Sequence, residues 1–126
     1  MKNGPAIPPK VFLVEDEVLV AFEMAETLRD FGFDVVGPSL RLEDGKEKAM
    51  AAEIDVALLD INLGRGTTSE PIADILRARN IPLVFMTAYD RTQIAFIHHD
   101  DALIRKPVYG PDLNSVLMKM FSTRNV

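Results

Sequence analysis

The chain of 126 residues contains no cysteine, so a disulfide framework and a thiolate metal site are both excluded. It is also short of positive charge, because 14 Lys and Arg stand against 19 Asp and Glu, for a formal net charge of −5. An acidic protein is poorly suited to non-specific binding of nucleic acid or of an anionic membrane. Docking on another protein remains open.

Long apolar runs are missing as well. No apolar stretch reaches the length of a bilayer-spanning helix, and the N-terminus lacks the continuous apolar segment of a signal peptide. We therefore predict a cytoplasmic protein whose residues 1–9 form a flexible, proline-rich tail. The remaining length suits one domain over residues 10–122, followed by a short tail over 123–126. Hydrophobic residues make up 48% of the chain, which is enough for a core.

Apolar runs of strand length alternate with amphipathic segments of helix length along the chain. The predicted strands are residues 10–14, 33–37, 54–59, 82–86 and 102–105. The predicted helices are residues 17–31, 40–52 and 70–79, a short one within 92–98, and a last one that opens at 110–112.

Small residues set the expected ends of these elements. Gly32 is expected to end the first helix, and the pair Gly37-Pro38 to end the second strand. Ser39 and Ser69 are expected to cap the N-termini of the second and third helices.

Strands that alternate with helices predict an α/β fold, in which a parallel sheet is covered on both faces and joined by right-handed crossovers. Sheets of this doubly wound kind place their chemistry at the carboxyl ends of the strands. Side chains that follow the predicted strands are therefore the candidates for function.

Polar residues follow four of the five predicted strands. Glu15 and Asp16 come after the first strand, Asp60 after the third, Thr87 after the fourth and Lys106 after the fifth. The topology brings these positions to one edge of the sheet, so that acids, one hydroxyl and one lysine would meet there.

Carboxylates brought close together repel one another unless a cation lies between them. Oxygen ligands without His or Cys favour a hard ion, here Mg²⁺ or Mn²⁺. A carboxylate such as Asp60 is a known covalent phosphoryl acceptor, and a fixed cation such as Lys106 neutralises charge on the transferred group. Thr87 is placed to donate a hydrogen bond to it.

These motifs, in this order, resemble the receiver domain of response regulators over roughly residues 10–122. The resemblance implies a flavodoxin-like (βα)5 fold with a five-stranded parallel sheet in the order 2-1-3-4-5 and a shortened fourth helix. It also implies that Asp60 is the phosphoacceptor. The metal ligands that it implies are Glu15, Asp16, Asp60 and Asn62, the last through its backbone carbonyl. The phosphate-binding and switch positions that it implies are Thr87, Ala88 and Lys106, with a cis peptide bond between Lys106 and Pro107.

The chain departs from the usual receiver pattern at two positions. Gly64 stands where most receivers have Pro, and Leu103 stands where many carry a switch aromatic, three residues before Lys106. Tyr89, two residues after Thr87, is the candidate substitute for that aromatic. The readout of phosphorylation is therefore expected to be atypical.

A narrower resemblance concerns residues 82–89, Pro-Leu-Val-Phe-Met-Thr-Ala-Tyr. They are similar to the Phe-Ala-Thr-Gly-Tyr-type signature of the FAT GUY subgroup of receivers, from which Met86 and Ala88 depart. The subgroup consists mostly of single-domain regulators of alphaproteobacteria, several of them linked to the general stress response.

The resemblance implies a two-component phosphorelay protein that takes a phosphoryl group from a histidine kinase or phosphotransfer protein. It would signal through phosphorylation-dependent protein interaction, without an output domain, as a monomer or a weak phosphorylation-dependent dimer. No enzymatic activity is expected beyond accepting the group and slowly losing it. Direct binding of nucleic acid or membrane is not expected.

Three other functions stay under consideration. One is a phosphate sink that drains a competing pathway, and another is a pseudo-receiver that binds partners without phosphorylation. A phosphatase of the haloacid-dehalogenase type is disfavoured, because Asn62 occupies the position of the second catalytic Asp. The cluster His98–Asp101 is interpreted as a solvated loop rather than a metal site.

Overall fold

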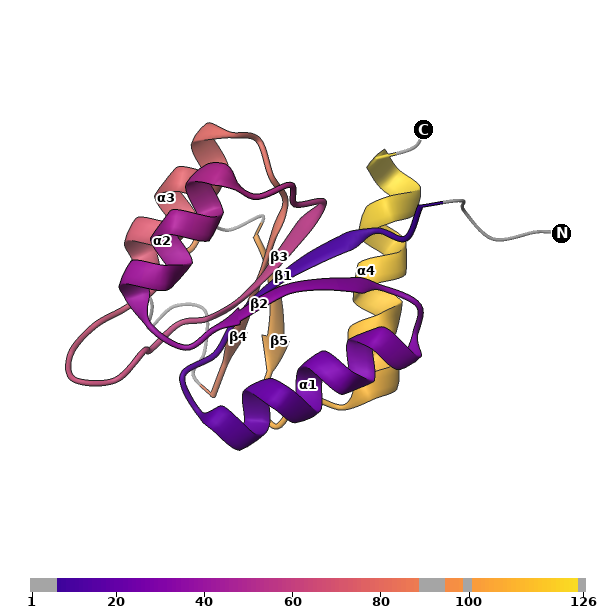
Figure 1. Ribbon diagram of the computed structural model, residues 1–126, viewed down its shortest axis with the longest axis horizontal. Helices are drawn as coiled ribbons and strands as arrows, with labels where there is room; N and C mark the ends of the chain where they lie inside the picture. The colour runs from indigo at the N-terminus through magenta and orange to yellow at the C-terminus, as the bar shows by residue number, and fades with distance from the viewer. Residues whose placement is uncertain (1–6, 89–94, 99–100, 125–126) are drawn as a thin grey trace, which may run out of the picture.

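Each apolar run predicted as a strand lies in one parallel sheet of the computed structural model, which describes residues 7–88, 95–98 and 101–124. The strands are β1 (Lys10–Val14), β2 (Asp34–Ser39), β3 (Val56–Asp60), β4 (Leu83–Thr87) and β5 (Ala102–Arg105). The helices are α1 (Val18–Asp30), α2 (Leu42–Ala51), α3 (Glu70–Ala78) and α4 (Gly110–Arg124). Figure 1 shows their arrangement.

The strand order is β2-β1-β3-β4-β5, and every neighbouring pair is parallel, which confirms the predicted fold class. The chain moves outward from β1 to β2, returns across β1 to β3, and continues to β4 and β5. The order therefore reverses direction between β1 and β3, where α/β sheets of this kind place their binding crevice.

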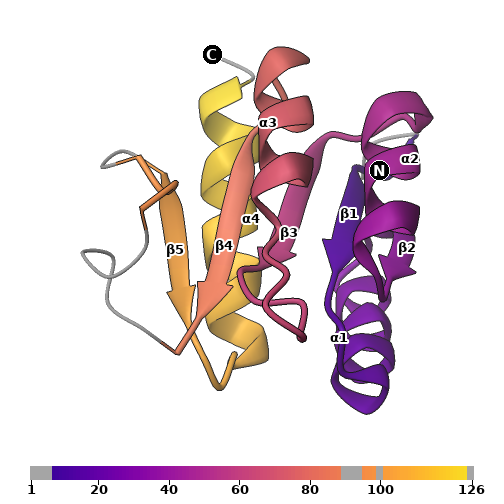
Figure 2. The same ribbon diagram turned by 90° about the vertical axis from the view of Figure 1, so that its left-hand side faces the viewer.

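Helices cover both faces of the sheet. α1 and α4 lie on one face, and α2 and α3 on the other (Figures 1 and 2). Alternate residues of each strand serve the two layers, so that Leu13 and Leu58 pack towards α1 and α4 while Phe12 and Leu59 pack towards α2 and α3. The side chains of β1, β3 and β4 are buried by helices on both faces of the sheet, so the sheet edge formed by the strand ends is where polar groups can reach solvent.

The second strand does not end where the sequence suggested. β2 continues through Gly37 and Pro38 to Ser39, and the Gly37–Pro38 peptide bond is cis. Phe12 pairs with Val36 but Val14 pairs with Ser39, so β2 carries one extra residue between these pairs. A bulge absorbs that residue, which explains how a turn-like dipeptide lies inside a strand.

The predicted helix caps are partly wrong. The N-cap of α2 is Arg41 rather than Ser39, because Ser39 is still paired in the sheet. Ser69 does occupy the N-cap position of α3, but its buried hydroxyl makes no hydrogen bond within the described part of the chain.

Other predicted ends differ slightly. β3 begins at Val56 but includes Asp60, and β4 includes Thr87, because both residues continue the ladder. α4 continues to Arg124, beyond the predicted domain end at 122. Part of the predicted short helix within 92–98 lies outside the described residues. None of the helices that the structure describes is long and apolar enough to cross a membrane.

Candidate functional site

The carboxyl ends of the strands bring the predicted site residues to one edge of the sheet. Glu15 and Asp16 directly follow β1, and Lys106 directly follows β5. Asp60 and Thr87 are the last residues of β3 and β4. The strands place these polar groups, because β1, β3 and β4 carry buried apolar side chains up to the end where the polar residues stand.

A lysine links the two buried acids. Lys106 Nζ donates to Glu15 Oε1 at 3.0 Å and to Asp60 Oδ2 at 3.1 Å. Glu15 is fully buried and Asp60 is 7% exposed. Residues 15, 60 and 106 are far apart in the chain, so the fold alone creates this contact.

Three carboxylates form a compact cluster beside this lysine. One oxygen each from Glu15, Asp16 and Asp60 lies within 4.8 Å of the others. A set of carboxylate oxygens suits a hard divalent cation such as Mg²⁺, which takes few protein ligands and keeps several waters. The donor set therefore fits the metal that the sequence predicts.

The charges in the pocket also favour the binding of a cation. Burial and the neighbouring Glu15 carboxylate together raise the pKa of Asp60 to about 7, although Lys106 opposes the rise. Burial likewise works to raise the pKa of Glu15, but hydrogen bonds from the Glu17 N–H and from Lys106 outweigh it and leave that pKa lowered. Without a second cation, the pair therefore tends to hold a proton on Asp60.

Lys106 stays charged in this setting. Burial works to lower the pKa of Lys106, but hydrogen bonds to Glu15 and Asp60 outweigh it, so that the pKa lies above its usual value. One fixed positive charge thus faces two buried carboxylates. The excess negative charge is what a divalent ion would neutralise.

A cavity of about 350 Å³ opens above the acids. Its wall includes Asp60, Thr87 and Lys106, together with Asn62 and Ala88. The Lys106 N–H also donates to the Thr87 carbonyl at 2.8 Å, which ties the ends of β4 and β5 together. The peptide bond between Lys106 and Pro107 is cis.

The backbone conformation explains why glycine stands at position 64, where most receivers have proline. The φ of Gly64 is +84°, a region that proline cannot adopt and that other side chains rarely do. A Cβ built there would lie 3.3 Å from Asp16 Oδ2. Glycine at this position therefore lets the loop after β3 pass close to the acid cluster without strain.

Two positions bear on the expected atypical readout, Leu103 and Tyr89. Leu103 lies in β5, partly buried, and packs against the core layer that contains Phe85. It is a core contact at the position of the usual switch aromatic. Tyr89, its predicted substitute, lies outside the described residues.

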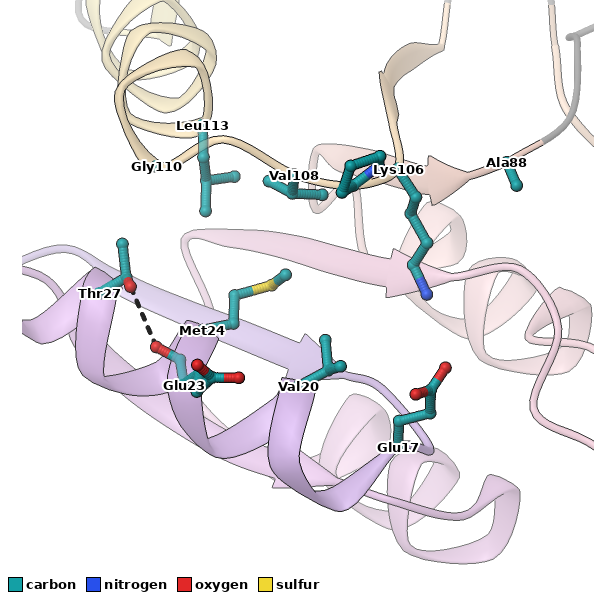
Figure 3. Close-up of a pocket in the computed structure, with 11 residues that line it drawn as sticks. Glu17, Val20, Glu23, Met24, Thr27, Ala88, Lys106, Val108, Gly110 and Leu113 are labelled. Atoms are coloured by element: carbon teal, nitrogen blue, oxygen red, sulfur yellow. Dashed lines mark hydrogen bonds between the residues drawn. The ribbon is translucent and has the colours of Figure 1, made fainter.

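A larger hollow of about 630 Å³ lies next to the acidic cavity, between α1 and the segment that leads from β5 into α4. Figure 3 shows Val20 and Met24 of α1 facing Val108 and Leu113 across it. No pattern in the sequence predicted this hollow. The residues that line both cavities are Glu17, Ala88 and Lys106.

The interpretation of His98–Asp101 as a solvated loop is incomplete at Asp101, while His99 and Asp100 lie outside the described residues. Arg77 of α3 donates to Asp101 Oδ2 at 2.7 Å and to the Phe96 carbonyl at 3.2 Å. The same Asp101 oxygen accepts the His98 N–H at 2.7 Å. Asp101 is therefore an anchor for the segment before β5, which could not be read from its neighbours in sequence.

The topology and the strand-end acids together define a doubly wound α/β protein with a lysine-bridged acidic pocket. The family model of the response regulator receiver domain matches residues 11–118, and the chain belongs to this family. The narrower FAT GUY assignment stays a prediction.

Two named relatives share parts of the sequence. The transcriptional regulatory protein PdtaR of Mycobacterium tuberculosis is 30% identical over 92 residues, which cover 71% of this chain and 43% of that protein. The phyllosphere-induced regulator PhyR of Methylorubrum extorquens is 26% identical over 111 residues, which cover 86% and 42%. The chain thus spans less than half the length of these relatives.

Solved structures confirm the fold. A response regulator receiver protein from Sinorhizobium medicae superposes with a TM-score of 0.81 at 21% identity, covering 93% of this chain and 97% of that one. The receiver domain of PhyR from Erythrobacter litoralis gives a TM-score of 0.81 at 23% identity, covering 94% and 93%.

Proposed function

We propose that the chain accepts a phosphoryl group on Asp60 from a histidine kinase or a phosphotransfer protein. The observation that carries this proposal is the contact of Asp60 with Lys106 inside a cluster of three acids. The phosphorylated form would then change its affinity for a downstream protein. No turnover is proposed beyond phosphoryl acceptance and slow self-dephosphorylation.

The chemistry is a displacement at phosphorus. A carboxylate oxygen of Asp60 attacks the phosphorus of a phosphohistidine, the P–N bond breaks as the O–P bond forms, and the leaving imidazole takes up a proton. Asp60 must be ionised to attack. Any group that stabilises its charge, and so counteracts the effect of burial and of Glu15 on its pKa, favours the reaction.

Protein groups around Asp60 serve the transferred group. Lys106 is placed to neutralise one phosphoryl oxygen, and Thr87, from the end of β4, to donate a hydrogen bond to another. A Mg²⁺ or Mn²⁺ ion would be held by Glu15, Asp16, Asp60 and the Asn62 backbone carbonyl, and would neutralise further charge on the phosphoryl oxygens.

Readout would follow from the same contacts. Lys106 now bonds both buried acids, and its N–H is tied to the Thr87 carbonyl. A phosphoryl group on Asp60 would compete for the Lys106 ammonium and thereby alter the ends of β4 and β5. The binding energy of that group is available to bias two states of this face.

The proposal is tested by labelling. The purified chain is incubated with Mg²⁺ and each histidine kinase of its host, or with acetyl phosphate, and resolved on a Phos-tag gel. Wild type should shift and Asp60→Asn should not. Asp55→Asn is the matched control, because this acid lies before β3, at the opposite edge of the sheet, where it accepts the Lys10 N–H.

Three outcomes would contradict the proposal. Equal labelling of Asp60→Asn and wild type would remove Asp60 as the acceptor. No labelling of wild type by any donor would favour the pseudo-receiver. If labelling occurs but no protein binds the phosphorylated form differently, the phosphate sink becomes the better account.

A further inference from the structure

The bulge in β2 places Ser39 at a junction between a helix and the acidic pocket. Ser39 is the last residue of β2 and is fully buried. Its position depends on the extra residue that β2 inserts between the pairs Phe12–Val36 and Val14–Ser39. Gly37 makes this possible, because it has a φ of +99° and a Cβ there would lie 2.7 Å from the Ser39 nitrogen.

The Ser39 side chain is bonded to α2. Its hydroxyl donates to Asp44 Oδ2 at 2.6 Å, and Asp44 also accepts from Lys48 Nζ at 2.8 Å, one turn further along the helix. Asp44 lies in the first turn of α2, whose N-cap makes no side-chain hydrogen bond. This pair therefore fixes α2 to the end of β2.

The Ser39 backbone is bonded to the site. The Glu15 N–H donates to the Ser39 carbonyl at 3.1 Å. Glu15 in turn accepts from Lys106, which bonds Asp60. A continuous series of hydrogen bonds thus runs from α2 to the acid that we propose as phosphoacceptor.

The packing around Ser39 leaves little freedom to replace these contacts. A Cβ on Gly45, one turn into α2, would lie 3.8 Å from Ser39 Cβ and 2.5 Å from Ile72 Cδ1. The glycine lets α2 lie close against β2 and α3. The buried Ser39 hydroxyl therefore meets the half-exposed Asp44 carboxylate at short range, and a hydrogen bond to an ionised acceptor is stronger than one between neutral groups.

We propose that Ser39 and Asp44 are positioning residues that set the backbone of Glu15 and thereby the arrangement of the acid cluster. The pair acts through Glu15 and touches neither the metal nor the phosphoryl group. This inference deepens the proposed function, because the cluster it arranges is the proposed divalent-ion site. Partners behind a metal ligand commonly affect metal affinity in this way.

A purely structural role makes a different prediction. If the Ser39–Asp44 bond only stabilised the first turn of α2, its loss would lower stability and leave Glu15 unchanged. Two readouts separate the roles: the Mg²⁺ affinity of the full chain by calorimetry, and the exchange rate of the Glu15 amide proton by NMR in metal-free buffer.

The variants are Ser39→Ala, Asp44→Ala and the double substitution. Each should weaken Mg²⁺ binding about tenfold and speed Glu15 amide exchange. The double variant should bind Mg²⁺ no more weakly than the single ones, because both remove the same bond. Glu43→Ala is the matched control, since it removes an acid from the same first turn without touching Ser39.

The proposal is overturned if Ser39→Ala and Asp44→Ala match Glu43→Ala in both Mg²⁺ affinity and Glu15 exchange, whatever their stability. Absence of Mg²⁺ binding by wild type would contradict the metal site of the proposed function instead. In that case the exchange rate of the Glu15 amide decides the positioning role by itself.

Discussion

At the residue scale, the ionised carboxylate of Asp60 lowers the stability of the metal-free fold. Its environment combines burial with a second buried carboxylate, and a single lysine offsets only part of the repulsion. Sites that perform chemistry commonly keep such strained electrostatics, because the same groups that disfavour the resting charge become useful once a ligand arrives.

Asp60→Asn should stabilise the metal-free protein. The pKa of Asp60 is raised from 3.8 to about 7, so ionisation is easier in the unfolded chain, and folding stability falls as pH rises between these values. The gain from Asn should be absent below pH 4 and complete above pH 7, at roughly 4 kcal/mol. Urea unfolding in a chelator across this pH range measures it. A gain that grows towards low pH would contradict the argument.

Lys106→Met should have the opposite effect. It keeps much of the side-chain volume but leaves Glu15 and Asp60 without their shared cation. We expect a loss of about 2 kcal/mol at pH 8 that shrinks at pH 5, where a carboxylate can take up a proton. Urea unfolding at the two pH values measures this, with Lys119→Met on α4 as a control outside the pocket. Equal losses at both pH values would show that packing rather than charge is responsible.

At the scale of elements, α3 anchors the chain just before β5. Arg77 reaches Phe96 and Asp101 through hydrogen bonds, and its guanidinium lies 5.7 Å from the centre of the Phe85 ring in β4. Phe85 and Phe96 also meet edge to face, with ring centres 5.7 Å apart. One side chain thus links α3, β4 and the segment before β5.

Arg77→Ala should loosen this junction. Loss of its hydrogen bonds should lower the free energy of unfolding by about 2 kcal/mol and speed amide exchange at His98 and Asp101. Asp74→Ala is the control, because its contact with Arg77 is exposed and spans 3.9 Å. Unchanged exchange at His98 and Asp101 in Arg77→Ala would mean that the segment is held by other contacts.

The sequence predicted most helices and strands correctly. The predictions were wrong where the conformation of a residue depends on contacts with residues far away in the chain. Strands with unbroken apolar runs, such as β3, were located because burial on both faces leaves a clear pattern. The predicted second strand ended too early, because Gly37-Pro38 is typical of a turn when only its neighbours in sequence are considered. Its pairing with β1 shows that the dipeptide lies in a bulge within the strand. The prediction that Ser39 caps the N-terminus of α2 was wrong for the same reason.

The site itself was predictable in its residues but not in its bonds. Parallel topology brings strand ends together, so Asp60, Thr87 and Lys106 could be grouped from their places in the chain. Which acids Lys106 contacts depends on side-chain packing. The hydrogen bond between Ser39 and Asp44 depends on how closely α2 approaches β2, which the sequence does not reveal.

At the scale of the whole molecule, ligand binding to the acid pocket should stabilise the entire fold. The pocket is built from β1, β3, β4 and the residue after β5, so it forms only when the sheet is complete. Any ligand specific to the folded state therefore raises the melting temperature by mass action.

Mg²⁺ together with beryllofluoride, a mimic of the phosphoryl group, should raise the melting temperature more than Mg²⁺ alone. At about one hundred times the dissociation constant the gain is about 2.7 kcal/mol. Asp60→Asn should lose the beryllofluoride-dependent part, as differential scanning calorimetry would show. An identical melting temperature of wild type with and without the mimic would support the pseudo-receiver.

The acid pocket and the apolar hollow beside α1 share part of their walls. Lys106 belongs both to the acid pocket and to the apolar hollow beside α1, so a molecule that fills the hollow and displaces this lysine changes the affinity of the pocket for cations. Thermodynamic linkage makes that effect reciprocal, and the cation must change the affinity of the hollow for its occupant by the same factor. Titrating either ligand at fixed amounts of the other would reveal one coupling free energy from two directions.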